Sequence, residues 1–466
     1  MNIAPELNRL HLSGNLPTTE NLRTKELTVD SEDLSLLTDL YQLTMAACYV
    51  GEGLDDRQAS FELFTRRLPE GFGYLIAMGL QQALEYLEQF RFTPEHLEAL
   101  QATGIFQHAP KEFWSRLAEA RFTGDLWAVP EGTAVFANQP LLRVEAPLWQ
   151  AQVVETYLLN VLNYQTLVAT RAARLRDVAG PLATLLEFGT RRAFSAQASL
   201  WAARAALAGG LDATSNVLAA LKLGQKPSGT MAHSLVMALT ATSGSEMEAF
   251  AAFHRYFPGA PLLIDTYDPL AAAKQLAERV NAGELQLSGV RLDSGDLVSL
   301  SKQVRSLLPG VPIFATGDLD EWEIARLKQS GACIDGFGLG TRLVTGAPVN
   351  GVYKLVEIDG IPTMKQSSNK ISYPGRKQIF RRIENGEMIS DRLGLMSEQP
   401  MEEQLLLQLV FSQGKRMWGE SLEQIRDRTA ASVASLPPQT RQLDRPTSPP
   451  MEISDPLQQL TYKTKR

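Results

Sequence analysis

The strongest constraint on the fold is a series of four short apolar segments in the second half of the chain. They begin near Pro261, Leu285, Val311 and Ala332, and a helical pattern follows each of the first three. Each unit takes roughly 25 residues, which suits a parallel strand and its crossover helix. The spacing therefore predicts a parallel sheet whose strands are joined by helices.

Acidic residues stand directly after the first three of these segments. Asp265, Asp293 and Asp318 occupy the predicted strand ends, and the fourth segment runs into Gly338-Leu339-Gly340-Thr341. In an α/β barrel the carboxyl ends of the strands carry the active site, and a glycine-rich turn after a late strand is a common phosphate site. We therefore predict an irregular α/β barrel with the acids and the glycine turn around one pocket.

Outside this series the chain changes to short β segments. Residues 125–144 contain apolar runs broken by prolines and glycines, and Asp359-Gly360 and Asn385-Gly386 predict two tight hairpins. We expect these strands to join in one discontinuous α+β sandwich domain beside the barrel. The predicted division is a polar extension (1–30), the discontinuous domain (31–146 plus 347–430), the barrel (147–346) and a Pro-rich C-terminal strap (431–466), for which a loose tail is the alternative.

Apolar periodicity also predicts individual elements. Helices are expected over 74–90, 147–178 and 230–240, and a mostly buried strand over 285–292.

Composition excludes several functional classes. The chain of 466 residues carries 45 basic and 52 acidic residues, a net charge of −7, which gives no bulk attraction for nucleic acid. No apolar run reaches the roughly 18 residues that span a bilayer, so we expect no membrane partner. Cys48 and Cys333 lie far apart and lack metal-ligand spacing, which favours a reduced, cytoplasmic setting.

The segment 293–296, Asp-Ser-Gly-Asp, is the first candidate for chemistry. Carboxylate oxygens at a strand end suit Mg²⁺, which usually binds one or two carboxylates plus substrate phosphates, and they suit a ribose diol equally well. The alternative is that these acids only cap the next helix, since Asp is a favoured N-cap residue. Asp293 is our candidate Mg²⁺ ligand.

Two arginines are candidates for binding an anion. Arg191 follows Phe188 closely, and a guanidinium beside an aromatic ring suits a flat, charged ligand. A surface ion pair with Glu187 is the alternative. Arg291 lies inside an apolar strand, where a guanidinium needs an anionic partner, which is either a ligand or a nearby aspartate.

His233 stands at the predicted start of a helix, in Gly-Thr-Met-Ala-His-Ser (229–234). The helix dipole there disfavours the imidazolium form and stabilises an anion placed on the ring. A phosphorylated histidine fits this position better than a proton shuttle. A histidine that is simply packed is the alternative.

Several motifs stand in a fixed order along residues 33–430. They are LTDLYQ (37–42), EFGTRR (187–192), TSNV (214–217), GTMAHS (229–234), VRLDSGD (290–296), GLGT (338–341) and GVYK (351–354). Together they resemble nicotinate phosphoribosyltransferase, a type II phosphoribosyltransferase.

The resemblance implies a reaction and its participants. Nicotinate, phosphoribosyl pyrophosphate and ATP would give nicotinate mononucleotide, pyrophosphate, ADP and phosphate, the first step of NAD salvage from nicotinate. It also implies Mg²⁺ and a homodimer with a shared active site. By this resemblance, ATP would transiently phosphorylate His233. The pyridine ring would stack between Phe188 and Tyr41 of the other subunit, and Arg291 and Thr230 would bind the nicotinate end, with Arg191 at the substrate. Gly340 and Thr341 would bind the ribose 5-phosphate, and Asp293 and Asp318 would lie at the ribose and metal.

Ser215 decides the expected substrate. Related nicotinamide enzymes carry an aspartate there, and an aspartate would repel the nicotinate carboxylate. Three alternatives stay open: a nicotinamide phosphoribosyltransferase, a quinolinate-using enzyme of the same fold, and a barrel that binds without turnover. Ser215 argues against the first, the ATP-linked histidine against the second, and intact His233, Arg291 and Asp293 against the third.

Overall fold

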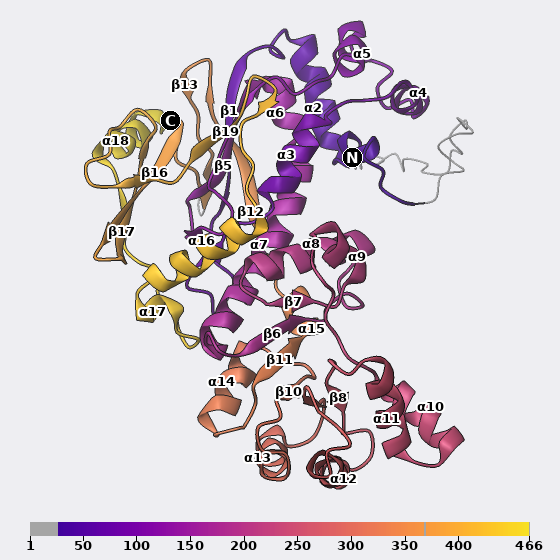
Figure 1. Cartoon of the computed structure of the whole chain (residues 1–466). Coiled ribbons are helices and arrows are strands. Elements are labelled where there is room, and N and C mark those ends of the chain that lie inside the picture. The colour runs from indigo at the N-terminus through magenta and orange to yellow at the C-terminus, as the bar shows by residue number, and fades with distance from the viewer. Residues whose placement is uncertain (1–26, 368–369, 466) are drawn as a thin grey trace, which may run out of the picture.

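Two regions make up the protein, one built on parallel and one on antiparallel strands (Figure 1). The computed structural model describes residues 27–367 and 370–465. Most of the predicted extension, residues 1–30, lies outside these ranges. We call strands β6 to β11 with helices α8 to α15 the parallel region, and the other sheets with their helices the antiparallel region.

The parallel region contains a six-stranded sheet with the order β7-β6-β11-β10-β9-β8. All of its pairings are parallel. Its strands are β6 (Thr184–Glu187), β7 (Ala213–Thr214), β8 (Leu262–Leu263), β9 (Val290–Leu292), β10 (Ile313–Ala315) and β11 (Gly336–Leu339). If the two edges of the sheet are joined into a ring, the strands follow one another around it in the order of the sequence, from β6 to β11. The two edge strands, β7 and β8, leave one gap in this ring.

A short connecting segment crosses that gap. The Ser228 N–H donates to Thr214 O of β7 at 2.9 Å, and the Thr230 hydroxyl donates to Pro261 O just before β8. Residues 228–230 therefore link the two edge strands and close the sheet into an irregular barrel. This confirms the predicted fold class.

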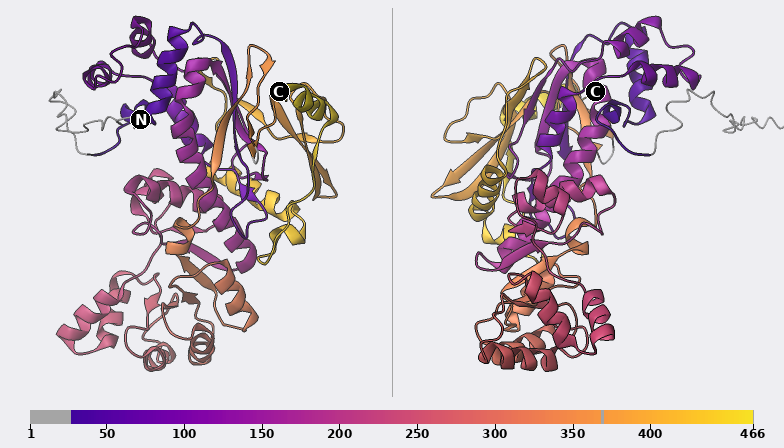
Figure 2. Two further views of the ribbon diagram at one scale, coloured as in Figure 1. Left: turned by 180° about the vertical axis from the view of Figure 1, so that it is seen from behind. Right: turned by 45° about the vertical axis from the view of Figure 1, so that its right-hand side comes forward.

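Helices surround this sheet (Figure 2). They are α8 (Ala196–Ala208), α9 (Val217–Lys222), α10 (His233–Ser243), α11 (Glu246–Tyr256), α12 (Pro269–Asn281), α13 (Leu297–Leu307), α14 (Glu321–Gln329) and α15 (Thr341–Val344). Asp268, Asp296 and Asp320 cap α12, α13 and α14, because each carboxylate accepts from backbone N–H groups in the first turn. The capping interpretation is thus correct for Asp296.

The antiparallel region is built on a seven-stranded sheet with the order β13-β12-β1-β5-β3-β19-β20. Strands from both ends of the chain join in it, as we expected for the β-rich segments: β1, β5 and β3 lie in the middle, and C-terminal strands flank them on both sides. They are β1 (Gln58–Thr65), β3 (Asp125–Ala128), β5 (Pro140–Pro147), β12 (Gly351–Ile358), β13 (Ile361–Pro362), β19 (Gln408–Ser412) and β20 (Lys415–Arg416).

Smaller sheets complete this region. They are β18-β16-β17-β21 (Gln404–Leu405, Lys377–Glu384, Glu387–Leu395, Met451–Ile453), β2-β4 (Leu75–Ile76, Ala134–Val135) and β14-β15 (Gln366–Ser367, Lys370–Ile371). Both hairpins form at the predicted turns, where Asp359 and Asn385 have φ of 49° and 50° before glycines that also have positive φ.

Helices pack on the antiparallel sheets and connect them to the barrel. They are η1 (Asp33–Ser35), α2 (Leu40–Gly51), α3 (Leu80–Glu88), α4 (Pro94–Ala102), α5 (Lys111–Ala118), α6 (Leu148–Val153), α7 (Glu155–Ala179), α16 (Leu422–Ser435), α17 (Pro438–Arg441) and α18 (Asp455–Thr464). The 25-residue helix α7 contacts β2 and β12 of the antiparallel region and α8 and α14 of the parallel region. It therefore runs through both regions (Figure 1).

Two predicted helices are wrong in part. The segment 74–90 begins as strand β2, and α3 starts only at Leu80. Gly79 has φ of 105°, and a Cβ there would lie 2.7 Å from Val161 O, so the chain turns at this glycine. The segment 147–178 forms two helices, α6 and α7, on either side of Val154.

Two further boundaries near the barrel are also wrong. The helix predicted over 230–240 begins at His233, because the chain up to Ala232 is extended as it crosses the barrel gap. The strand predicted over 285–292 is reduced to Val290–Leu292. Its neighbour β10 begins after Pro312, which accepts from the Val290 N–H but has no N–H to extend the ladder.

Within residues 27–367 and 370–465, no helix is long and apolar enough to cross a membrane. Cys48 and Cys333 are both free thiols.

Candidate active site

The predicted strand-end acids meet at the carboxyl edge of the parallel sheet. Asp265 Oδ2 accepts from the Asp293 N–H at 2.7 Å and from the Ser294 hydroxyl at 2.8 Å. The Thr316 hydroxyl, at the end of β10, donates to Asp293 Oδ1. Adjacent strand ends are therefore tied together through their own polar residues, which fixes the Asp293 carboxylate in place.

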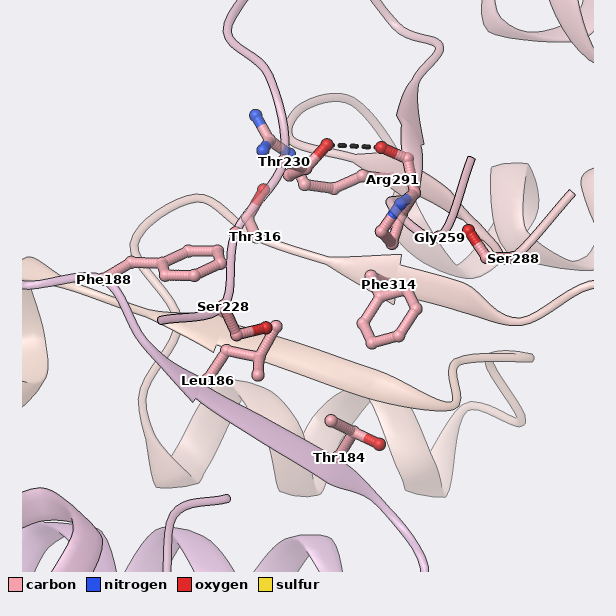
Figure 3. Close-up of a pocket in the computed structure, with 13 residues that line it drawn as sticks. Thr184, Leu186, Phe188, Ser228, Thr230, Gly259, Ser288, Arg291, Phe314 and Thr316 are labelled. Carbon is pink, nitrogen blue, oxygen red and sulfur yellow. Dashed lines mark hydrogen bonds between the residues drawn. The ribbon is translucent and has the colours of Figure 1, made fainter. Parts of the chain in front are cut away.

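A pocket of about 180 Å³ opens inside the barrel beside these acids (Figure 3). Alternate residues of β6 face it, as the two-residue period of a strand requires. Its lining is Thr184, Leu186, Phe188, Ser228, Gly229, Thr230, Gly259, Pro261, Ser288, Arg291, Phe314, Thr316 and Gly338. Among these lining residues Arg291 alone is charged.

Arg291 enters this pocket, and no carboxylate among residues 27–367 and 370–465 is in contact with it. Its neighbours across the sheet are Leu263 and Phe314, and its buried Nε has no hydrogen-bond partner among the described residues. Burial lowers the pKa of Arg291, while Asp293 and Asp265 act in the opposite direction. A partly desolvated guanidinium with an unused donor is suited to a carboxylate ligand.

Two aromatic rings shape the pocket because β11 carries glycine opposite them. A Cβ at Gly338 would lie 2.6 Å from the Phe188 ring, and one at Gly336 would lie 2.6 Å from the Phe314 ring. These glycines let both rings lie over the sheet, and Phe188 stands at the edge of the pocket (Figure 3). The result is a narrow apolar space suited to a flat ring.

A second, more open pocket of about 450 Å³ adjoins the first and shares Thr316 with it. Asp293, Ser294 and Asp318 line it. Its two arginines already have acidic partners, since Arg342 contacts Asp320 and Arg326 lies 2.6 Å from Glu323. Gly340 and Thr341 stand at the start of α15, whose four residues follow β11 directly. This side offers carboxylates, hydroxyls and backbone N–H groups.

His233 is the first residue of α10 and faces the ends of β8. Its Nδ1 lies 3.0 Å from the Thr266 hydroxyl, and its Nε2 lies 3.9 Å from Asp265 Oδ1. The His233 side chain is 38% exposed, whereas that of Asp265 is 2% exposed. The ring is thus held from one side and open to a ligand from another.

The acids fit a metal that the substrate helps to bind. In the described residues, no group of three or more His, Cys, Asp or Glu side chains is placed to hold an ion. Mg²⁺ does not need such a group, because it usually takes one or two carboxylates and completes its shell with water and phosphate oxygens. Asp293, with Asp318 in the same pocket, meets that requirement.

Six predicted site residues line neither pocket: His233, Gly340 and Thr341, described above, and Tyr41, Arg191 and Ser215. Tyr41 lies on α2 in the antiparallel region and is 47% exposed. Arg191 is exposed beyond the end of β6, near enough to Arg291 to affect its pKa. Ser215 does not line the pocket but lies behind Gly229, with 3.9 Å between its Cβ and a Cβ built at that glycine.

The sequence interpretation missed several residues at the site. Ser228 and Phe314 line the barrel pocket, and Thr266 contacts His233. Ser228 directly precedes the 229–234 motif and Thr266 directly follows a strand-end acid, so both could have been found by extending these motifs by one residue. Phe314 carries no such signal, because only the strand order places it beside Arg291.

The two adjoining pockets lie at the carboxyl ends of the parallel strands, which is where α/β-barrel enzymes carry their active sites. Three family models match the chain: the nicotinate phosphoribosyltransferase N-terminal domain over residues 36–163, the family itself over 183–311 and the C-terminal domain over 397–461.

Individual relatives agree with these models. The chain is 42% identical to nicotinate phosphoribosyltransferase pncB2 of Mycobacterium tuberculosis over 435 residues, which is 90% of this chain and 92% of that protein. It is 44% identical to nicotinate phosphoribosyltransferase of Bacillus subtilis over 399 residues, 80% of this chain and 79% of that one. The crystal structure of human nicotinic acid phosphoribosyltransferase superposes with a TM-score of 0.81 at 30% identity, over 92% of this chain and 100% of that one. The chain belongs to the nicotinate phosphoribosyltransferase family.

Proposed function

We propose that this enzyme joins nicotinate to the ribosyl carbon of phosphoribosyl pyrophosphate, giving nicotinate mononucleotide and pyrophosphate in a reaction coupled to ATP. This would be the first step of NAD salvage from nicotinate, and we place it in the cytoplasm. The observation that carries the proposal is Arg291, the one charged side chain in the lining of the barrel pocket, whose Nε has no hydrogen-bond partner among the described residues.

The pocket chemistry favours the acid over the amide. An aromatic carboxylate in the slot beside Phe188 would bring its negative charge to Arg291 and an oxygen to the Ser228 hydroxyl. The Thr230 hydroxyl beside it would have to turn from Pro261 O to donate to the ligand. No carboxylate stands in the lining to accept from an amide NH₂. Quinolinate carries a second carboxylate, for which the lining provides no second cation. Nicotinate is the pyridine that this charge distribution suits best.

The second pocket suits the phosphoribosyl group. Displacement at the anomeric carbon develops positive charge on the ribose, and Asp293 and Asp318 provide negative charge beside it. Gly340 and Thr341 would hold the 5-phosphate with backbone N–H groups. Mg²⁺ held by Asp293 would neutralise charge on the departing pyrophosphate.

His233 is proposed to couple the reaction to ATP. A proton on Nδ1 can be donated to the Thr266 hydroxyl, which leaves the Nε2 lone pair free. Nε2 would attack the γ-phosphorus, the bond to the bridging oxygen would break, and ADP would leave with that electron pair. Hydrolysis of the phosphohistidine would then return free imidazole and phosphate. The position at the start of α10 favours the added negative charge.

Tyr41 is proposed to act in the second subunit of a homodimer. In its own chain it lines neither pocket and keeps 47% of its surface exposed. A partner subunit could supply its ring opposite Phe188, which would complete the slot on its open side.

A competition assay tests the substrate. With equal nicotinate and nicotinamide, we expect product from nicotinate almost alone, and Ser215→Asp should weaken nicotinate binding because it adds a charge behind Gly229. Comparable turnover of both pyridines by the unmodified enzyme would reject the assignment.

The ATP step is tested by incubation with [γ-³²P]ATP: we expect acid-labile, base-stable label that disappears in His233→Ala. Equal labelling of that variant would exclude His233.

A further inference from the structure

Glu187 is a buried carboxylate to which the proposed reaction gives no role. It is the last residue of β6 and is 1% exposed. The pocket-facing residues of β6 are Thr184 and Leu186, so Glu187 belongs with Leu185 to the opposite, helix-covered face, where Leu185 is part of an apolar core. Burying a carboxylate on such a face is costly unless donors compensate for the lost water.

The donors that contact Glu187 come from the turn after β6 and from the neighbouring strand. The Thr214 hydroxyl, on β7, donates to Oε2 at 2.5 Å, and the Gly189 N–H donates to Oε1. In the part of the chain that the structure describes, no Lys, Arg or His forms an ion pair with it. Burial raises the pKa of Glu187, and these two hydrogen bonds offset only part of that effect.

The hydrogen bonds of Glu187 connect the turn that carries Phe188, which lines the pocket, with the segment 214–216, which lies outside the lining. Thr214 Oγ1 also accepts from the Asn216 N–H at 2.9 Å, so its single proton is directed to Glu187. The Ser215 N–H donates to the Glu187 carbonyl oxygen at 2.9 Å. One residue thus sets the distance between the turn that carries Phe188 and the segment that carries Ser215.

There is little room for the turn to adopt another shape. A Cβ at Gly189 would lie 2.4 Å from Val344 Cγ1 and 2.9 Å from Glu187 Oε1. The Phe188 N–H is held by Leu339 O at 2.7 Å. A shift of the Glu187 carboxylate would therefore be transmitted to the Phe188 ring, which lies directly over Gly338.

We propose that Glu187 is a positioning residue for the pyridine pocket: through Thr214 and Gly189 it holds the Phe188 ring and the Ser215 segment at the separation that nicotinate requires. Glu187 does not touch the substrate in this role. The inference rests on the proposed function, because it concerns the nicotinate half of that site.

Two substitutions at Thr214 separate hydrogen bonding from packing. Thr214→Val keeps the shape and removes the hydroxyl, whereas Thr214→Ser keeps the hydroxyl and removes a methyl group. We expect Thr214→Val to raise the KM for nicotinate, and its Kd in calorimetry, about tenfold, while kcat and the KM for phosphoribosyl pyrophosphate stay within about twofold. Thr214→Ser should stay within about twofold on all four quantities.

Glu187→Gln provides a second measurement that does not depend on Thr214. An amide can accept from Gly189 only by turning its NH₂ toward Thr214, which reverses the direction of the hydrogen-bond chain. We expect the nicotinate KM to rise about fivefold, with thermal unfolding monitored to confirm a folded protein.

The opposite results would overturn the proposal. Wild-type nicotinate affinity in both Thr214→Val and Glu187→Gln would show that the hydrogen bonds do not position the pocket, and an equal loss in Thr214→Ser would show that packing does so. If Thr214→Val does not fold, Glu187→Gln alone decides by the same criterion. An unmodified enzyme that binds nicotinate but does not convert it would instead contradict the proposed activity, and the Kd comparison would still decide the role of Glu187.

Discussion

Two arginines, each in the middle of a strand, show how the two regions differ: Arg381 is fully buried and Arg291 is partly buried. Arg381 in β16 lies opposite Asp391 in β17 and forms a two-point pair with it, at 2.9 and 2.8 Å. Gln139 donates a further hydrogen bond to the same carboxylate at 2.6 Å. Arg291 in β9 has Leu263 and Phe314 as its cross-strand neighbours, and its Nε has no hydrogen-bond partner in the part of the chain that the structure describes.

The difference separates a structural charge from a functional one. Where the sheet itself supplies the counterion, the charge of the arginine is already paired within the protein, and the pair contributes to the specificity of the fold. Where the neighbours are apolar, the desolvation cost is met only when an anion binds. The antiparallel region therefore stabilises the molecule, whereas the barrel keeps a donor available in its pocket. Four predictions test this comparison.

Arg291→Ala should have the largest effect, and it should appear in activity. We expect kcat/KM for nicotinate to fall about 10³-fold, roughly 4 kcal/mol, because a charged hydrogen-bond partner of the substrate is lost. The free energy of unfolding in urea should stay the same or rise, since a buried donor without a partner is removed. A loss of stability comparable to that of the next variant would make Arg291 structural and end the comparison.

Asp391→Ala should show the reverse pattern. It leaves the Arg381 guanidinium buried without a counterion, so we expect a loss of about 3 kcal/mol of unfolding free energy. Steady-state kinetics of the folded enzyme should keep the wild-type KM for nicotinate. The matched control is the double variant Arg381→Met with Asp391→Leu, which should regain most of that stability; no recovery would mean that packing, and not the unpaired charge, caused the loss.

Two buried glutamates extend the comparison to pH. Burial would raise the pKa of Glu131, but Arg204, 2.6 Å away, lowers it below 4.5, whereas burial raises the pKa of Glu187, which has no cation. Because the pKa of Glu131 is lowered on folding, its contribution to stability is present above pH 4.5 and is lost on acidification. Because the pKa of Glu187 is raised on folding, the folded state loses stability as the pH rises from 4.5 through that raised pKa.

Unfolding free energies measured across this range should separate the two glutamates. Glu131→Gln should flatten the curve below pH 4.5 and Glu187→Gln should flatten it above, each by at most about 1.4 kcal/mol per pH unit. Flattening on the same side in both variants would contradict the assigned causes.

Asn385→Ala should have the smallest effect. The residue has φ of 50° in the turn between β16 and β17, and alanine in that conformation costs about 1 kcal/mol. The KM for nicotinate should not change, because the turn lies in the antiparallel region. Asn385→Gly serves as the control, with stability close to wild type; a change in KM would show that this hairpin reaches the active site.

Sequence patterns were sufficient to predict those parts of the fold that depend on residues close together in the chain. The strand-and-helix repeat predicted the parallel strands, and the Asp-Gly and Asn-Gly pairs predicted both hairpins, because positive φ is a property of the turn residues themselves. The acids after β8, β9 and β10 were expected to converge, and Asp265 does contact the Asp293 segment. Which acid of the 293–296 segment faces a pocket and which caps a helix was left open by the sequence.

The tertiary structure decided what depends on strand order. The chain passes from β7 to the opposite edge of the sheet and returns, so that β11 lies between β6 and β10. Only this order places Phe188 over Gly338, Phe314 beside Arg291 and Thr214 against Glu187. Residues far apart in sequence gain or lack a partner according to which strands become neighbours, and the spacing of apolar segments along a chain does not contain that information.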